Sequence, residues 1–516
     1  MRQTWLLRLG LLPALTFAGL FLGRQSLASR MSSPVTFTHG VASGDVTPFS
    51  AVLWTRVSGK AILTVEVSGD PMFQANTFES VTLASAHSDF TVKVTAVPLM
   101  PNMTYFYRWR HDSTLSDVGT FKTPPLRVAP ADIRFAYSGD SDGTRVNGIP
   151  FFNNFEVLDA ARNEDLDFFI YLGDTVYSDS GLRTTGPAAT LDEYRATYRV
   201  NRAMDALRDL MKATSIYSIW DDHEVRNDYD GRTVDPTLYA NGRRAFLEYM
   251  PVLPLNLPDF PGCAALPLFR VFHWGKDVDV IILDERSCRS PDVQDACDGD
   301  LAPALPSFVR AQFGLSPAPP SGCLEALLDP SRTMLGTLQK ALFKIFLQSS
   351  KAKFKFVINE VPIQQFYALP YDRWEGYAAE RAEILHFIRD QQIRNVVFLS
   401  TDTHANLINE VFIDRFTDAE PIADEFVTGP IATVTFEQDI RRSVPIGLDP
   451  DAVVDALNAL FDIVGVDCRH LDAFSYGLVE VDAGAGTASI TLKDDRGAAL
   501  VDQSNPATSC AKTIGP

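Results

Sequence analysis

The sequence has few basic residues and no closely paired cysteines. Its 516 residues include 46 lysines and arginines against 65 aspartates and glutamates, so the formal net charge is -19. A nucleic-acid-binding protein needs a basic face, and this balance argues against one. None of the six cysteines forms a Cys-x-x-Cys pair, which argues against a structural zinc site. The acidic excess is compatible with a cation-dependent enzyme, although it could also serve solubility alone.

Long apolar runs are missing after residue 30, so no later segment is expected to cross a bilayer. At the start of the chain, Arg2 and Arg8 precede an apolar stretch from Leu9 to Gly23, and Ser26-Leu27-Ala28 offers small residues for cleavage. This pattern predicts a signal peptide over residues 1–28 and a periplasmic or secreted protein. An uncleaved amino-terminal anchor is the alternative. A twin-arginine pair is missing, which favours general secretion.

The cysteines agree with export, because disulfides persist in oxidising compartments. Four lie in one loop-rich region and two lie near the carboxyl terminus. We expect disulfides inside each group, for example Cys288 with Cys297 and Cys468 with Cys510, while the spacing leaves the connectivity open. The full set is Cys263, Cys288, Cys297, Cys323, Cys468 and Cys510.

The apolar pattern changes near residue 124. Residues 35–123 alternate apolar and polar side chains in short runs such as Thr104–Trp109, which predicts a small β-sandwich of the immunoglobulin or fibronectin type. Residues 124–132 are predicted to be a linker. Residues 133–500 alternate strand and helix patterns, which predicts a layered domain around a central sheet. Residues 501–516 are expected to form a C-terminal tail.

Four short oxygen-rich patches each follow an apolar run that is predicted to be a strand. Ligands in such sheets gather at the carboxyl ends of strands. Carboxylates in close contact repel each other unless a cation lies between them. The patches therefore predict a metal cluster. They are Tyr137–Asp140, Leu172–Tyr177, Trp220–Glu224 and Ser400–His404.

Each patch also has a plainer interpretation. Tyr177 taken alone is more often a packing residue, but it follows Gly173-Asp174 closely enough to act as a phenolate ligand. The run Asp221–Asp228 could be a solvated turn, yet it follows a buried apolar strand, where clustered carboxylates are costly unless compensated. His404, two residues after Asp402, is a better ligand candidate than a lone histidine. Oxygen donors suit calcium, magnesium, manganese or ferric iron more than copper or zinc.

Taken in order, these motifs resemble the PhoD-type alkaline phosphatase and phospholipase D family, a branch of the metallophosphoesterase superfamily. The similarity covers nearly the whole mature chain, and the ordered set is far more specific than any single motif. Besides the metal motifs, the matching segments are Phe37–Asp45, Val52–Arg56, Leu283–Arg286, Arg332–Gly336, Asn359–Pro362 and Trp374–Tyr377.

The resemblance implies an α+β protein with two domains, a β-sandwich followed by a four-layer αββα metallophosphoesterase domain. It also implies two or more metal ions, calcium with ferric iron. Many members have a cysteine where this chain has Asp140, and this oxygen ligand favours manganese, magnesium or calcium. One site would be formed by Asp140, Asp174, Tyr177, Asp402 and His404. Asp174 would bridge to calcium ions held partly by Asp221 or Asp222 and by Asn227 or Asp228.

The resulting prediction is a secreted metal-dependent phosphoesterase that hydrolyses phosphate mono- or diesters by attack of a metal-bound hydroxide. His223 is the candidate for charge stabilisation or leaving-group protonation, and a purely structural hydrogen bond is the other role open to it. One alternative is a phospholipase D-like lipid phosphodiesterase. Another is a non-catalytic, calcium-stabilised secreted binding protein. The apolar approach for a lipid would be lined by Phe366, Tyr367, Leu369 and Trp374.

Overall fold

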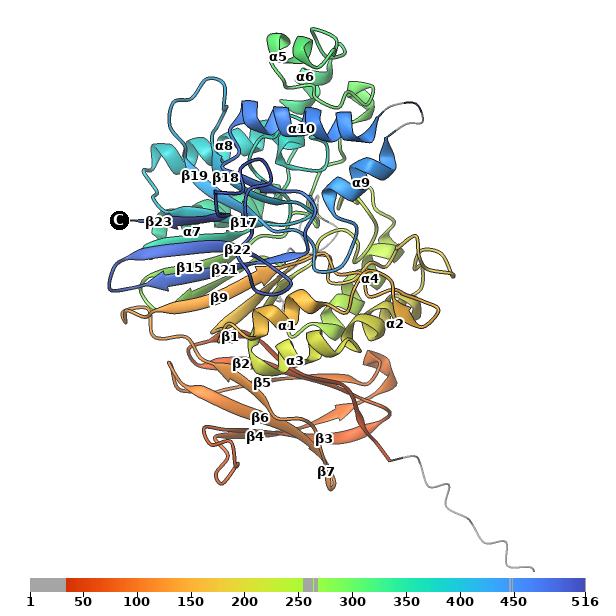
Figure 1. Ribbon diagram of the computed structural model, residues 1–516. Helices are drawn as coiled ribbons and strands as arrows, with labels where there is room; N and C mark the ends of the chain where they lie inside the picture. The colour runs from red at the N-terminus through yellow and green to blue at the C-terminus, as the bar shows by residue number, and fades with distance from the viewer. Residues whose placement is uncertain (1–33, 254–262, 264–267, 445–446, 448, 516) are drawn as a thin grey trace, which may run out of the picture. The chain divides into compact units, whose positions relative to one another are not determined.

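The computed structural model describes residues 34–253, 263, 268–444, 447 and 449–515 (Figure 1). The predicted signal peptide, residues 1–28, lies outside the described residues. Within those ranges, no helix is both long and apolar enough to span a membrane.

The N-terminal strands form a β-sandwich, as their alternating pattern predicts. One layer is a five-stranded sheet in the order β4-β3-β6-β7, with β8 beside β6. The other layer is β1, β2 and β5, and buried residues such as Leu53 and Val65 fill the space between the layers. The elements are β1 (Phe37–Thr47), β2 (Ser50–Val57), β3 (Ala61–Ser68), β4 (Phe78–Ala84), η1 (Ala86–Ser88), β5 (Thr91–Ala96), β6 (Thr104–His111), β7 (Thr114–Leu115) and β8 (Gly119–Lys122).

The layer β1-β2-β5 continues into a nine-stranded sheet of order β23-β22-β21-β9-β12-β13-β1-β2-β5. Strands β9, β12 and β13 are parallel, with Ile170 between Tyr137 and Tyr217, so their carboxyl ends share one edge. The segment expected to be a tail contributes β23 to the opposite end of this sheet. The further strands are β9 (Ile133–Ser138), β12 (Phe168–Leu172), β13 (Ser215–Ile219), β21 (Ser475–Asp482), β22 (Thr487–Asp494) and β23 (Ala511–Ile514), and β10 (Arg145–Val146) and β11 (Ile149–Pro150) form a separate pair.

A second sheet has seven strands in the order β14-β15-β16-β17-β19-β18-β20. Its central strands β15, β16 and β17 are parallel, so this sheet also has an edge at which several strands end together. The strands are β14 (Arg270–Trp274), β15 (Val278–Ile282), β16 (Phe354–Ile358), β17 (Val396–Ser400), β18 (Asn406–Val411), β19 (Ala423–Val427) and β20 (Cys468–His470).

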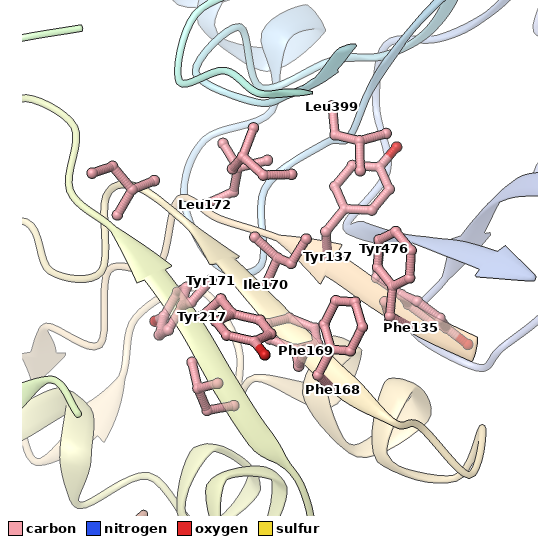
Figure 2. Packing of buried hydrophobic residues seen from close by; sticks show 14 of the residues in the cluster. Phe135, Tyr137, Phe168, Phe169, Ile170, Tyr171, Leu172, Tyr217, Leu399 and Tyr476 are labelled. Atoms are coloured by element: carbon pink, nitrogen blue, oxygen red, sulfur yellow. The ribbon is translucent and has the colours of Figure 1, made fainter. Parts of the chain in front are cut away.

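The two large sheets share one buried core, in which aromatic residues of the nine-stranded sheet lie near Leu399 of the second sheet (Figure 2). The ring of Phe135 stacks on Phe168 with centroids 4.6 Å apart and meets Phe356 of the second sheet edge-on at 5.1 Å. The buried Tyr137 hydroxyl donates to the carbonyl of Phe426 at 3.2 Å. The core of this part of the chain therefore lies between the sheets, and the polar strand ends are left at its margin.

Helices cover the outer faces of both sheets. Leu158 of α1 and Leu210 of α3 pack in the core of the nine-stranded sheet, and Phe343 of α7 and Leu385 of α8 pack against the seven-stranded sheet. This is the four-layer αββα arrangement that the resemblance implies, and it is confirmed. The helices are α1 (Glu156–Arg162), α2 (Leu191–Arg202), α3 (Asp205–Ala213), α4 (Pro236–Tyr249), η2 (Asp295–Cys297), α5 (Ser307–Gln312), α6 (Cys323–Leu327), α7 (Gly336–Ser349), η3 (Trp374–Tyr377), α8 (Ala378–Asp390), α9 (Phe436–Ser443) and α10 (Pro450–Val464).

Two helices near the site begin at well-formed caps. Thr190 and Glu193 form a capping box at the start of α2, and Asp235 accepts two backbone hydrogen bonds at the start of α4. Asn201 lies in the last turn of α2, and its side chain donates to the carbonyls of Ser141 and Thr175. The end of this helix is thereby tied to two strand-end loops of the site.

The disulfides correct one expected pair and confirm the other. Cys288 bonds Cys263 and not Cys297, which bonds Cys323 instead. Cys468 bonds Cys510, as expected. The mistaken pair joined neighbours in sequence, whereas the actual bonds join segments that only the fold brings together; α6, which begins at Cys323, packs against η2.

Candidate metal centre

The predicted ligands lie where parallel strands of the two facing sheets end. Asp140 follows β9, Asp174 follows β12 and Asp222 follows β13 in the nine-stranded sheet. Asp402 and His404 follow β17 in the seven-stranded sheet. The strand ends thus bring together acids from distant parts of the chain, as the strand-end pattern predicts.

Four of these residues adopt left-handed backbone conformations, which residues other than glycine seldom use. The φ angle is 57° at Asp140, 44° at Asp174, 65° at Asp402 and 54° at His404. Such conformations cost energy and persist only where the surrounding structure imposes them. Such conformations cluster at functional sites, and here all four occur at candidate metal ligands.

The first group of candidate ligands is Asp140, Asp174 and His404, whose ligand atoms lie within 4.8 Å of one another. The Tyr177 hydroxyl lies 3.0 Å from Nε2 of His404. The Thr401 hydroxyl donates to one carboxylate oxygen of Asp140, and the other is buried with no hydrogen-bond partner among the described residues. Burial lowers the pKa of His404 to about 4, so its imidazole is neutral and able to bind a cation.

The second group is Asp174, Asp222 and His223. Nδ1 of His223 lies 2.6 Å from Asp179, while Nε2 lies 3.9 Å from Asp174 and 4.0 Å from Asp222. The Tyr177 ring stacks on the imidazole with centroids 4.1 Å apart. Burial disfavours the charged ring, but Asp222 and Asp179 outweigh it and raise the pKa of His223 to about 9. One nitrogen is therefore anchored and the other faces the shared carboxylates.

The third group is Asp222, Asp372 and Asp402. The resemblance placed Asp402 with Asp140 and His404; in the structure a carboxylate oxygen of Asp402 also lies within 4.8 Å of oxygens of Asp222 and Asp372. Because Asp174 and Asp222 each belong to two groups, the three groups form one continuous cluster.

Arg286 is buried inside this cluster. Its Nε donates to Asp221 at 2.5 Å, and its two terminal nitrogens donate to the Asp372 carboxylate at 2.8 Å each. Asp222 and Asp402 lie 3.6 Å and 3.7 Å from it. Burial disfavours a charged Asp372, but Arg286 outweighs it and holds the pKa of that carboxyl well below its usual range. Arg286 thus neutralises part of the acidic cluster from within.

Asn227 and Asp228 lie at the exposed rim. The Asp228 backbone N–H donates to Asp222 at 2.6 Å, and the Asn227 amide donates to Asp228 at 2.6 Å. The Asn227 backbone N–H donates to Asp179 at 2.7 Å. Both rim residues line the same cavity as the buried groups, so both side chains are near enough to the cluster to contribute oxygen ligands.

The acids repel one another as they stand. Burial raises the pKa of Asp140, Asp174 and Asp402 well above the ordinary value, and Asp221 and Asp222 add to the effect. Buried oxygens of Asp140, Asp221 and Asp222 have no hydrogen-bond partner among the described residues. Cations between these carboxylates would satisfy the oxygens and remove the repulsion. The donor set, carboxylates with neutral imidazole and phenol, fits calcium, magnesium, manganese or ferric iron.

A cavity of about 340 Å³ opens onto the cluster. Asp174 and Asp402 both line it, so the acids of the two sheets face one space. The lining residues are Asp174, Asp222, His223, Asn227, Asp228, Leu369, Asp372, Arg373, Asp402, Thr403, His404, Phe436 and Asp439.

The four residues considered as an apolar approach for a lipid do not together line the cavity. Phe366, Tyr367 and Trp374 are buried, with Phe366 and Tyr367 in one core cluster and Trp374 in another. Only Leu369 of these four residues lines the cavity, where it is 40% exposed.

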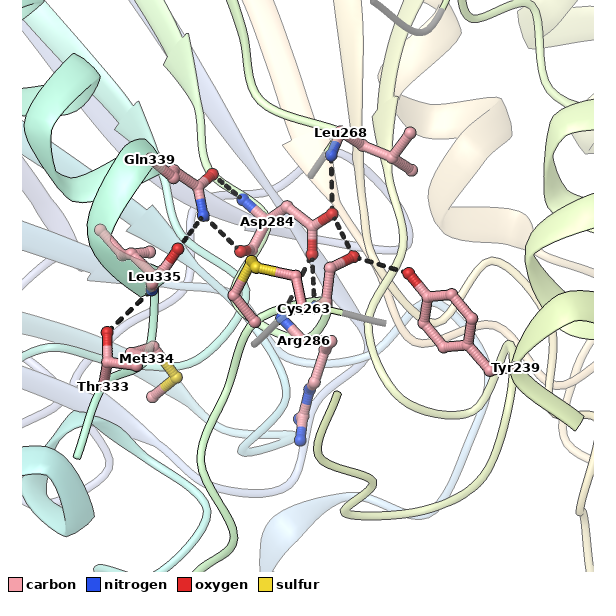
Figure 3. Close-up of a disulfide and its surroundings, with 12 residues drawn as sticks. Tyr239, Cys263, Leu268, Asp284, Arg286, Thr333, Met334, Leu335 and Gln339 are labelled. Atoms are coloured by element: carbon pink, nitrogen blue, oxygen red, sulfur yellow. Dashed lines mark hydrogen bonds between the residues drawn. A yellow bond between two sulfur atoms is a disulfide. The ribbon is translucent and has the colours of Figure 1, made fainter. Parts of the chain in front are cut away.

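Sequence reasoning did not identify Asp179, Arg286 or Asp372 as members of the site. Arg286 and Asp372 lie in or beside segments of the family resemblance. Neither of them directly follows an apolar run of the kind that identified the other site residues. The loop that carries Arg286 is held by Asp284, whose backbone N–H and carbonyl bond the Gln339 amide at 2.9 Å and 2.7 Å (Figure 3). These contacts join segments that are far apart in sequence, which is why no local pattern reveals them.

Two family models match the chain: the N-terminal domain of PhoD-like phosphatases over residues 24–125, and PhoD-like phosphatase over residues 146–489. Alkaline phosphatase D of Bacillus subtilis (strain 168) is 28% identical over 436 residues, covering 77% of this chain and 69% of that protein. A solved structure of PhoD has a TM-score of 0.73 and 23% identity, covering 93% of this chain and 90% of its own. The purple acid phosphatase PPD1 from yellow lupin (Lupinus luteus) seeds has a TM-score of 0.54 and 12% identity, covering 92% and 73%. The two solved structures establish a shared fold.

Proposed function

Since the chain belongs to the PhoD-like phosphatase family and is a metal-dependent phosphoesterase, we propose that its cavity hydrolyses phosphate monoesters and diesters outside the cytoplasm. The observation that carries the proposal is the continuous cluster formed by the three ligand groups. Shared carboxylates at Asp174 and Asp222 are what two or more neighbouring cations require. Three disulfides among the described residues support an extracytoplasmic location.

We assign the candidate ligands to two neighbouring cation sites. Asp140, Asp174, Tyr177 and His404 would hold one cation, with Asp174 shared with the next. Asp222, Asp402 and Asp372 would hold the second, with Asn227 or Asp228 contributing from the rim. When bound, such cations stabilise negative charge on the phosphoryl group and lower the pKa of water. Calcium with manganese or magnesium fits a site in which Asp140 supplies oxygen, and ferric iron is the family's alternative.

His223 is the proposed proton donor to the leaving group. Asp179 fixes the proton on Nδ1, and the protonated ring presents an N–H at Nε2 toward the cavity. The hydrogen bond from the Asn227 backbone fixes the second oxygen of Asp179, so the pair is rigid. Tyr177 stacks on the imidazole and prevents it from rotating out of this orientation. A donor held in this way can protonate a departing alkoxide without reorganising.

The test combines metal analysis with turnover. Elemental analysis of protein purified without added metal should give at least two equivalents of cation per chain. Hydrolysis of p-nitrophenyl phosphate and bis-p-nitrophenyl phosphate should be lost in Asp174→Asn and Asp402→Asn, together with bound metal. Turnover that survives both substitutions at full metal occupancy would refute the assignment. Absence of turnover in the metal-loaded wild type would instead support the non-catalytic alternative, and preference for phosphatidylcholine would support the lipid one.

A further inference from the structure

Among the described residues that line the cavity, Arg373 is the one arginine or lysine. Six aspartates line the same walls, and a phosphate ester that enters carries negative charge. Bound cations would attract it from the side of the cluster. Arg373 offers a fixed positive charge that belongs to the protein itself.

The guanidinium of Arg373 is held in place by its surroundings. Its Nη2 donates to the carbonyls of Ala368 and Leu369, and the group lies over the ring of Phe366, 5.0 Å from the centroid. Glu375 lies 3.8 Å away, but both of its oxygens already accept backbone hydrogen bonds. The arginine is therefore oriented before any substrate binds.

Donors on this guanidinium nevertheless remain free. Its Nε is buried and has no hydrogen-bond partner among the described residues. Arg286, by contrast, gives its Nε and both terminal nitrogens to Asp221 and Asp372. Of these two arginines, only Arg373 combines an unpaired Nε with a place among the lining residues of the cavity. Free guanidinium N–H groups donate charge-assisted hydrogen bonds to phosphate oxygens, and these are among the stronger hydrogen bonds in proteins.

The loop that carries Arg373 is strained. Tyr367 and Leu369 have φ angles of 59° and 50°, and the Leu369 backbone N–H is tied to the Leu301 carbonyl at 2.7 Å. Asp372, the neighbour of Arg373, belongs to the third ligand group. The strained loop therefore places a candidate metal ligand and a cation side by side at the cavity wall.

We propose that Arg373 binds the phosphoryl group of the substrate and favours monoesters over diesters. The inference rests on the proposed phosphoesterase function of this cavity. A monoester presents a dianion with three non-bridging oxygens, whereas a diester presents a monoanion with two. An added guanidinium contact therefore strengthens binding of the monoester, and of inorganic phosphate, more than that of the diester.

The experiment uses Arg373→Gln and Arg373→Lys in the metal-loaded full chain. In the glutamine variant, the Kd of inorganic phosphate measured by calorimetry and the KM of p-nitrophenyl phosphate should rise together, by about tenfold or more. The KM of bis-p-nitrophenyl phosphate should rise less, and kcat should change little. The lysine variant, which keeps the charge and loses the guanidinium N–H donors, should have a phosphate Kd and a monoester KM between those of wild type and the glutamine variant. Metal content should stay at the wild-type value.

Arg332→Gln is the matched control. Arg332 also donates to backbone carbonyls, those of Ala326 and Gly376, and lies over the Tyr377 ring, but it does not line the cavity. An unchanged phosphate Kd in Arg373→Gln, or an equal rise in Arg332→Gln, overturns the proposal. Loss of metal in Arg373→Gln also overturns it, because Arg373 would then only support Asp372. If wild type binds phosphate through Arg373 yet turns over no ester, the proposed function fails and the Arg373 assignment stands.

Discussion

Replacing Asp179 by asparagine tests how His223 works. Asp179 accepts two hydrogen bonds, from Nδ1 of His223 at 2.6 Å and from the Asn227 backbone N–H at 2.7 Å. Both partners are donors, and an asparagine amide offers one acceptor oxygen and one NH2 group. Since the backbone donor cannot move, the amide oxygen should pair with it and the NH2 group should face His223. The ring then loses the partner that keeps a proton on Nδ1.

The size of the effect follows from the bond that is lost. A hydrogen bond to a charged group contributes about 1.5–3 kcal/mol. Each 1.36 kcal/mol lost from transition-state stabilisation is about tenfold in rate. We therefore expect kcat to fall about 10–100-fold in Asp179→Asn, the range usual for an outer partner of a site histidine. The KM should change little, because Asp179 is not itself among the lining residues.

The assay compares two leaving groups. A proton donor matters most for a poor leaving group, so the loss of kcat should be larger with phenyl phosphate than with p-nitrophenyl phosphate. Asp279→Asn is the matched control, because Nδ1 of His273 lies 2.6 Å from Asp279 in an equivalent pair away from the cavity. That variant should keep the wild-type kcat for both esters. Metal content measured alongside separates a loss of proton transfer from a loss of cation.

Two results would refute this reasoning. An Asp179→Asn variant that is as active as Asp279→Asn would show that the anchored imidazole plays no part in turnover. An equal loss of kcat for both esters at full metal content would show that His223 stabilises charge or binds metal and does not protonate the leaving group.

Two further predictions concern stability. Removing the cations with a chelator should lower the Tm, because the buried carboxylates of the cluster then repel one another, and re-adding calcium or manganese should restore it; a Tm indifferent to both would contradict a metal cluster. The pKa of His39 is lowered to about 3 by burial and by Arg56, so the unfolded chain binds the extra proton as pH falls below about 6.5. The free energy of unfolding should thus decrease between pH 6.5 and 4, with at most about 1.4 kcal/mol per pH unit due to His39. His39→Gln should flatten this slope in denaturant titrations and leave the free energy of unfolding at pH 8 nearly unchanged. An unaltered slope would rule out a neutral, partly buried imidazole at His39.

Periodicity and strand ends were enough to predict a β-sandwich, a layered domain with strands and helices, and the meeting of the acidic patches, whereas the four-layer arrangement was implied by the family resemblance. The patches at Asp140, Asp174 and Asp402 follow apolar strands, and parallel strands end at one edge, so their convergence follows from local patterns. The partners that complete the site lie on irregular loops. Asp372 and Asp179 have no periodic neighbours, and their roles depend on contacts across the fold. The disulfide of Cys288 was mispaired for the same reason, since the nearest cysteine in sequence is not the nearest in space.

The pair Asp221 and Asp222 shows what the fold adds to such patterns. The sequence makes the two acids equivalent, as both follow β13 directly. In the structure Arg286 takes one oxygen of Asp221 and also binds Asp372, while Asp222 lies in two of the three ligand groups. A buried arginine balances part of the negative charge of the carboxylates around it, and cations would balance the rest. Arg286 contacts Asp221 and Asp372 more closely than it contacts Asp222, so the protein itself balances less of the charge of Asp222. The charge of this acidic cluster therefore depends on the buried Arg286 as much as on the candidate ligands.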